Sequence, residues 1–215
     1  METDPDGRAL MDNYASHMFT DAVQAEQASL GMRDRFQKMY RNRFTDGLDD
    51  DTRAFVATRT SFYMATVGET GWPYVQHRGG PPGFLTLLDD DLLGFADYKG
   101  NKQLISKGNI SGNDRVSLFL MDYSRKARLK IIGHAKMIMG EDDPKLAARL
   151  ETVGQGTVER LTTIRVVAYD WNCPKYIEPR FTEAEIEKML GPRIKELSDE
   201  NARLREMLAA KERDK

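Results

Sequence analysis

The middle of the chain contains six short segments rich in β-branched and aromatic residues, which are typical of strands. Turn-forming sequences such as GETGWP, GGPP, KGN and GND separate them. Only one helical crossover fits, near KQLISKG. A doubly wound parallel sheet needs a helix after nearly every strand, so this order predicts a small antiparallel barrel instead. The segments are residues 61–67, 73–79, 83–89, 92–97, 115–122 and 127–139.

Helical patterns precede the strands. Residues 1–18 are polar and aperiodic, which predicts a mobile arm or a strap over a partner subunit. Residues 19–40 have apolar side chains at loosely helical spacing, with Asp21 placed to cap and Gly31 as a break. We expect one bent helix or two short ones. The acidic triplet 49–51 precedes another helical pattern and is interpreted as its cap.

After the sixth segment, residues 142–150 are typical of a short capped helix and residues 159–171 of a long strand that completes the barrel. The predicted class is α+β, mainly β. We expect three parts: an N-terminal arm with helices (1–57), a barrel (58–178) and C-terminal helices (179–215).

The C-terminal segment has strong helix signals. Thr182 and Glu185 have the spacing of a capping box, and the first helix is expected to stop at Gly191–Pro192. A second helix is predicted to begin at that proline.

Apolar residues in this second helix alternate at spacings of four and three, which is the seam of a heptad repeat. Asn201 occupies an a position, where a buried amide favours two parallel strands in one register. Glu200 and Arg205 fall at g and e. The pattern predicts a dimer, although a single amphipathic helix packed on its own domain also fits. The seam residues are Leu190, Ile194, Leu197, Asn201, Leu204 and Leu208.

Composition excludes several classes of protein. The 32 Lys and Arg residues against 34 Asp and Glu residues disfavour a nucleic-acid partner. No apolar run approaches the roughly 18 residues of a membrane span, and METDPDGRAL lacks a secretory pattern. We therefore expect a cytoplasmic protein. One cysteine and three scattered histidines predict neither a disulfide framework nor a metal site.

Two segments could bind an anion. In the first, a strand carrying Gln76, His77 and Arg78 meets a glycine-rich turn, where backbone can approach a ligand closely. In the second, Asn101 and Lys102 fall at an expected helix start, where amide groups and an ammonium favour negative charge. Hydrolase and nucleotide-binding motifs are absent from the sequence.

The order of these elements, ending in WNCPKYI at residues 171–177, resembles the pyridoxamine 5′-phosphate oxidase-like family of FMN-binding split barrels. The resemblance runs from about Thr58 to Ile177 and implies a barrel of about six antiparallel strands that binds FMN as a homodimer. The residues it places at the cofactor are Gln76, His77, Arg78, Gly79, Phe95, Ala96, Asn101, Lys102, Arg128 and Trp171.

The resemblance also implies roles. Arg78 and the Asn101–Lys102 segment would hold the phosphate, and Arg128 would reach the flavin of the other subunit. The implied activity is an FMN-dependent oxidoreductase that transfers hydride at flavin N5, with a small molecule or a nicotinamide cofactor as partner and no catalytic side chain assigned. The Arg-Leu-His motif of the vitamin B6 oxidases has no counterpart after Ile177, so pyridoxamine phosphate is not the expected substrate.

Other interpretations stay open. The barrel could be a non-catalytic flavin sensor that signals through its coiled coil, or it could hold haem or a deazaflavin. Cys173 is interpreted as a small packed side chain.

Overall fold

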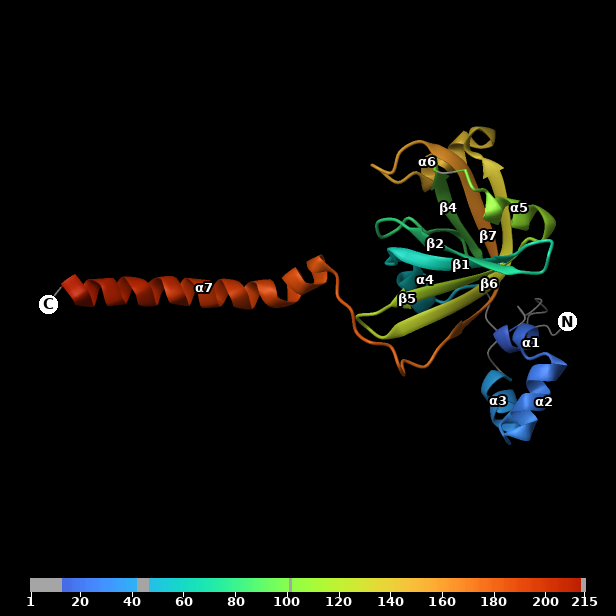
Figure 1. The fold of residues 1–215 in the computed structure, drawn as a ribbon, viewed down its shortest axis with the longest axis horizontal. Coiled ribbons are helices and arrows are strands. Elements are labelled where there is room, and N and C mark those ends of the chain that lie inside the picture. The colour runs from blue at the N-terminus through green and yellow to red at the C-terminus, as the bar shows by residue number, and fades with distance from the viewer. Residues whose placement is uncertain (1–12, 42–46, 101, 214–215) are drawn as a thin grey trace. The chain divides into compact units, whose positions relative to one another are not determined.

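Seven antiparallel strands form one sheet in the computed structural model, which describes residues 13–41, 47–100 and 102–213. The order is β2-β1-β5-β6-β7-β4-β3 (Figure 1). Within the described ranges the two edge strands, β2 and β3, do not pair, so the barrel stays open. This is the split barrel that the sequence predicts. The strands are β1 (Ser61–Val67), β2 (Pro73–Gly79), β3 (Thr86–Asp89), β4 (Leu92–Tyr98), β5 (Arg115–Asp122), β6 (Ala127–Met139) and β7 (Val158–Trp171).

The two longest strands, β6 and β7, give the sheet its curvature. Their register shifts between Ile132 and Gly133. A Cβ at Gly133 would lie 2.4 Å from the carbonyl oxygen of Arg165, so only glycine permits this approach of the two backbones. Beyond the shift, β7 pairs with β6 on one side and with β4 on the other. It thereby joins strands β2, β1, β5 and β6 to strands β4 and β3 in one sheet.

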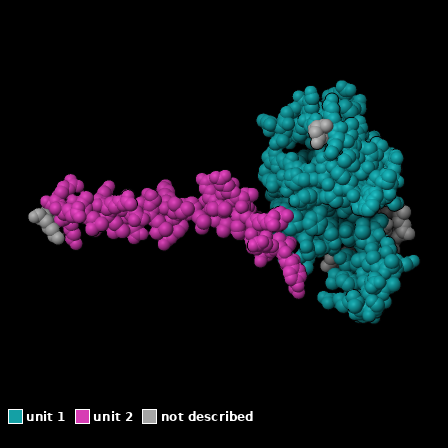
Figure 2. Space-filling view, viewed as in Figure 1, with its two compact units in different colours: residues 1–122, 127–174 teal, residues 123–126, 175–215 magenta. Residues whose placement is uncertain are grey.

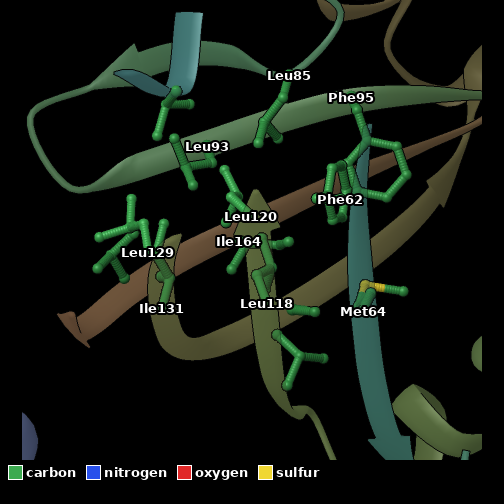
Figure 3. Close-up of a cluster of buried hydrophobic side chains, with 14 of the residues drawn as sticks. Phe62, Met64, Leu85, Leu93, Phe95, Leu118, Leu120, Leu129, Ile131 and Ile164 are labelled. Carbon is green, nitrogen blue, oxygen red and sulfur yellow. The ribbon is translucent and has the colours of Figure 1, made fainter. Parts of the chain in front are cut away.

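The interior is filled by alternate residues of the strands. In β5, Val116, Leu118 and Leu120 are buried while their neighbours are more exposed. The Phe62 ring lies 5.4 Å from the Phe95 ring in an edge-to-face contact, and Figure 3 shows the two side by side. This core joins β1 and β5 to β4, so it fixes the strands that carry the site described below.

Of the two expected arrangements, the structure confirms two short N-terminal helices, α2 (Asp21–Ser29) and α3 (Arg33–Tyr40). Between them Gly31 has a φ of 65°, which suits a break at glycine. The expectation for Asp21 was wrong, because the Thr20 side chain accepts the capping hydrogen bond and Asp21 is already helical. Residues 14–18, expected to be part of an arm, form α1 (Tyr14–Met18), and residues 1–12 lie outside the described ranges.

Three more helices flank the sheet: α4 (Asp50–Ala57), α5 (Ile105–Gly112) and α6 (Pro144–Leu150), the last preceded by a 3₁₀ turn (Gly140–Asp142). Asp49 caps α4, accepting a 2.7 Å hydrogen bond from the Thr52 backbone, which confirms the predicted role of the acidic triplet. Asp143 caps α6 in the same way.

The chain divides into two compact units (Figure 2). The first contains residues 1–122 and 127–174, and the second contains residues 123–126 and 175–215. No helix in the described part of the chain is both long and apolar enough to cross a membrane.

The second unit is dominated by α7 (Glu183–Arg213). The capping box is confirmed, since Thr182 and Glu185 exchange backbone-to-side-chain hydrogen bonds. The predicted stop at Gly191–Pro192 was wrong, because α7 continues through Pro192. A proline removes one backbone hydrogen bond, and an exposed helix can leave the freed carbonyl to water.

Candidate functional site

A small pocket lies where β2 and β4 approach the start of α5. It has a volume of about 110 Å³, and we call it the cation pocket because four cationic side chains and one carboxylate line it. Its charge therefore favours an anion. The lining residues are Tyr74, Gln76, Arg78, Asp97, Tyr98, Gly100, Lys102, Gln103, Leu104, Ile105, Ser106, Lys107, Met137 and Arg160.

One carboxylate organises the two largely buried guanidinium groups of the cation pocket. Arg78 Nη1 donates a 2.7 Å hydrogen bond to Asp97 Oδ1, and Arg160 donates to Asp97 Oδ2 from Nε and Nη2 at 3.2 Å. Arg160 also pairs with Glu159 at 3.0 Å. The side chains of Arg78 and Arg160 are only 12% and 9% exposed. Such a network holds both cations in fixed positions beside the pocket.

The start of α5 adds backbone donors. Leu104, the residue before the helix, has a φ of 57°, and no side chain caps the first turn. The first amide groups of a helix without a cap are available to an anion. The Ser106 hydroxyl donates a 2.7 Å hydrogen bond to the side-chain oxygen of Gln76, which ties this turn to β2.

The helix start differs from the sequence prediction. The Asn101–Lys102 segment was expected to open the helix, but α5 begins at Ile105. Lys102 instead has a φ of 58° in the preceding loop, and its side chain lines the cation pocket. Asn101 lies outside the described residues. Lys102 thus lines the pocket from a loop, where the residue is exposed.

A second pocket, of about 210 Å³, adjoins the first and shares Arg78, Asp97 and Tyr98 with it. We call it the glycine pocket, because Gly79 and Gly80 form part of its wall. Phe95 lines it although the residue is only 2% exposed, so most of its ring packs in the core. The lining residues are His77, Arg78, Gly79, Gly80, Phe84, Phe95, Ala96, Asp97, Tyr98, Thr152 and Gln155.

Arg78 separates the two pockets and is incompletely bonded. Its Nε is buried and has no hydrogen-bond partner among the described residues. A buried donor without a partner costs free energy, so this nitrogen indicates that an acceptor belongs beside it. The donors present, two guanidinium groups, two lysines and an uncapped helix start, match the several oxygens of a phosphate ester.

Comparison with known proteins identifies the family. The sequence pattern of the pyridoxamine 5′-phosphate oxidase family matches residues 48–164, more than half of the chain. The chain belongs to the pyridoxamine 5′-phosphate oxidase family. This is a flavin-binding family, so the family indicates a flavin-type cofactor as the class of ligand.

Solved structures are similar to this chain at low identity. HupZ from Group A Streptococcus is 15% identical, with a TM-score of 0.46 over 62% of this chain and 99% of that one. General stress protein 26 from Bacillus anthracis is 14% identical, with a TM-score of 0.42 over 60% of this chain and 92% of that one. No curated protein matches the chain.

Seven residues that the family resemblance placed at the cofactor line the two pockets. They come from three separate segments: β2, β4 and the loop before α5. The fold therefore brings together positions that are up to 26 residues apart in the sequence. These residues are Gln76, His77, Arg78, Gly79, Phe95, Ala96 and Lys102.

The other two described residues of that set, Arg128 and Trp171, line neither pocket. Trp171 donates from Nε1 to the Thr52 hydroxyl at 3.2 Å and packs edge-to-face on Phe55. Arg128, near the start of β6, has a buried Nε that lacks a partner among the described residues.

Sequence reasoning missed Arg160 and Asp97. Arg160 occupies the same face of β7 as the buried residues Thr162 and Ile164. An arginine at an inward-facing position of a strand could have been identified from the sequence, because arginine is rarely buried without a partner. Cys173 also needs a correction, because it was interpreted as packed but is exposed.

Proposed function

We propose that the protein is an FMN-dependent oxidoreductase whose cation pocket holds the phosphate of the cofactor. The observation that carries the proposal is the unpartnered Arg78 Nε beside the Asp97–Arg160 network. In a family that binds flavins, this arrangement favours a phosphorylated flavin over riboflavin.

The donors of the cation pocket suit a doubly charged phosphate. Arg78 and Arg160 are held by Asp97, so little side-chain entropy is lost when they bind. Lys102 would add an ammonium from the loop, and the first backbone amide groups of α5 would donate hydrogen bonds to the remaining phosphate oxygens.

The glycine pocket is the proposed position of the flavin ring. Gly79 and Gly80 have no side chains to occupy the space, and Phe84 and Ala96 give an apolar wall. Its 210 Å³ is below the roughly 300–1,000 Å³ typical of ligand pockets. The proposed site therefore needs a second surface to cover the ring.

A second copy of the chain is the proposed source of that surface. One face of β1 and β2 carries the exposed apolar residues Tyr63, Val67 and Val75 in adjacent register positions. Arg128, whose Nε has no hydrogen-bond partner among the residues that the structure describes, would approach the flavin from the partner. The proposed site is thus built at the interface of a homodimer.

Bound FMN would supply hydride transfer at N5, between a small-molecule substrate or a reduced nicotinamide and the flavin. The chain's own residues would bind the phosphate, orient the ring and exclude water. No amino-acid nucleophile is needed for this chemistry, and none is assigned.

The test is to identify the molecule that co-purifies with the protein. We expect a yellow protein whose extracted ligand has the absorption spectrum and mass of FMN. Extraction of haem or a deazaflavin, or a colourless protein that does not bind added FMN, would overturn the proposal. Rapid reduction by a nicotinamide cofactor and reoxidation by an acceptor would separate an enzyme from a flavin sensor.

A further inference from the structure

Helix α7 exposes all its large apolar side chains. None of its 31 residues is buried, and the exposed fractions of Leu190, Ile194, Leu197, Leu204 and Leu208 lie between 41% and 63%. Most helices in proteins are stabilised by packing of an apolar face, because propensity alone gives marginal stability in water. The exposed stripe therefore indicates a partner that covers it.

The stripe is a heptad seam of defined length. Leu190, Leu197 and Leu204 occupy d positions, and Ile194, Asn201 and Leu208 occupy a positions. One heptad earlier, the corresponding positions hold Glu183 and Glu187, so the seam starts at Leu190. From Leu190 to Leu208 it extends about 27 Å at 1.5 Å per residue.

Pro192 falls at an f position, on the opposite side of the helix from the seam. The freed backbone carbonyl then faces solvent rather than the seam. The proline is therefore compatible with pairing along the whole stripe.

We propose that α7 pairs with α7 of a second copy of this chain as a parallel two-stranded coiled coil over residues 190–208. In this register Asn201 faces the partner's Asn201, where the two amides can bond to each other. Glu200 at g lies opposite the partner's Arg205 at e, which gives two attractive charge pairs per dimer. The pairing is independent of flavin binding.

The antiparallel arrangement fits the same stripe poorly. The register that fills all six layers places Asn201 against the partner's Leu197, so the amide, which donates to the Leu197 carbonyl of its own helix at 2.9 Å, finds no polar side chain across the interface. In that arrangement g positions face g positions, so Glu200 would lie beside the partner's Glu200. The environment of the Asn201 amide and the charge of Glu200 therefore both favour the parallel pair.

Disulfide trapping in the full chain distinguishes the arrangements. In a Cys173→Ser background, Leu208→Cys places one thiol at the end of the seam. The two thiols meet in the parallel pair, whereas an antiparallel pair separates them by about 27 Å, beyond the roughly 7 Å that a disulfide tolerates. The control is Glu206→Cys at an f position, close to the same end of the helix but facing outward.

We expect Leu208→Cys to form covalent dimers under mild oxidation at least tenfold faster than Glu206→Cys. Equal rates for the two variants would overturn the proposal, as would a monomer in sedimentation of the unmodified chain. In a second test, Leu197→Asp with Leu204→Asp should lower the fraction of α7 that is helical by circular dichroism. The double variant should keep the ligand affinity of the barrel, so failure of the coiled coil and failure of the flavin site are separable.

Discussion

Arg78 and Asp97 join the two ends of the sheet. Arg78 lies on β2, one edge strand, and Asp97 lies on β4, next to the opposite edge strand β3. Their 2.7 Å ion pair crosses the opening of the split barrel, and both pockets lie beside it. The candidate site is therefore located where the sheet fails to close, which leaves its strand-edge groups available to a ligand.

We expect Asp97→Asn to destabilise the protein by about 3 kcal/mol, because it leaves two largely buried guanidinium groups without their shared carboxylate. A bound phosphate would restore the missing negative charge. Added FMN should therefore raise the melting temperature of the variant more than that of the wild type, whereas Asp91→Asn, at an exposed pair with Arg165, should match the wild type. An equal or smaller rise in the Asp97 variant would contradict this assignment.

Arg160→Gln should weaken FMN binding by about tenfold or more, since a charge-assisted hydrogen bond contributes about 1.5–3 kcal/mol. Arg165→Gln is the matched control on the same strand, because Arg165 is 60% exposed and lies outside both pockets. Titration followed by flavin fluorescence measures both affinities. If the two variants bind equally well, Arg160 has no part in the site.

Gly133→Ala should lower the free energy of unfolding by about 1–3 kcal/mol, because its Cβ would collide with the Arg165 backbone. Gly108→Ala is the opposite case: α5 has open space at this position, and alanine favours a helix by about 0.5–1 kcal/mol. Urea unfolding measures both changes. A neutral Gly133→Ala would mean that β6 and β7 are not pressed together at the register shift.

Asp49 should make stability depend on pH. Burial opposes its ionisation, but hydrogen bonds from Thr52 and Tyr169 prevail and hold the pKa of Asp49 below its ordinary 3.8. A carboxyl with a lowered pKa contributes stability above its ordinary pKa, and that stability is lost as the pH falls through the folded-state pKa.

Urea unfolding between pH 7 and pH 3 measures this contribution. Asp49→Asn keeps the helix cap and should show a smaller loss of stability below pH 4 than the wild type. Asp49→Ala removes the cap and should cost about 1 kcal/mol at pH 7. An identical pH dependence in wild type and Asp49→Asn would exclude this role.

Strand positions could be predicted from the sequence because turn residues mark their ends. The bounds of β1, β2, β5 and β6 agree with the predicted segments. Helix ends were less predictable. Pro192 predicted the end of a helix, but α7 continues through it. The GNK sequence predicted the start of a helix, but Lys102 and Leu104 after it have positive φ angles. At these two places the tertiary structure overrides the local conformational preference of the residues.

The site could be predicted only in part. Arg78 and Lys102 follow from a family resemblance, but the link from Arg160 to Asp97 spans 63 residues and depends on the pairing of β4 with β7. No local pattern encodes that pairing. The Arg128 Nε likewise has no hydrogen-bond partner in the described part of the chain, so the sequence of that part could not have indicated one.

The phosphate assignment is tested most directly by comparing FMN with riboflavin. Equilibrium titration of each ligand should show that the wild type prefers FMN by about a hundredfold, since at least two charge-assisted contacts depend on the phosphate. Arg78→Ala combined with Lys102→Ala should reduce that preference nearly to one, while Lys136→Ala, on an exposed position of β6, should preserve it. An unchanged preference in the double variant would contradict the account.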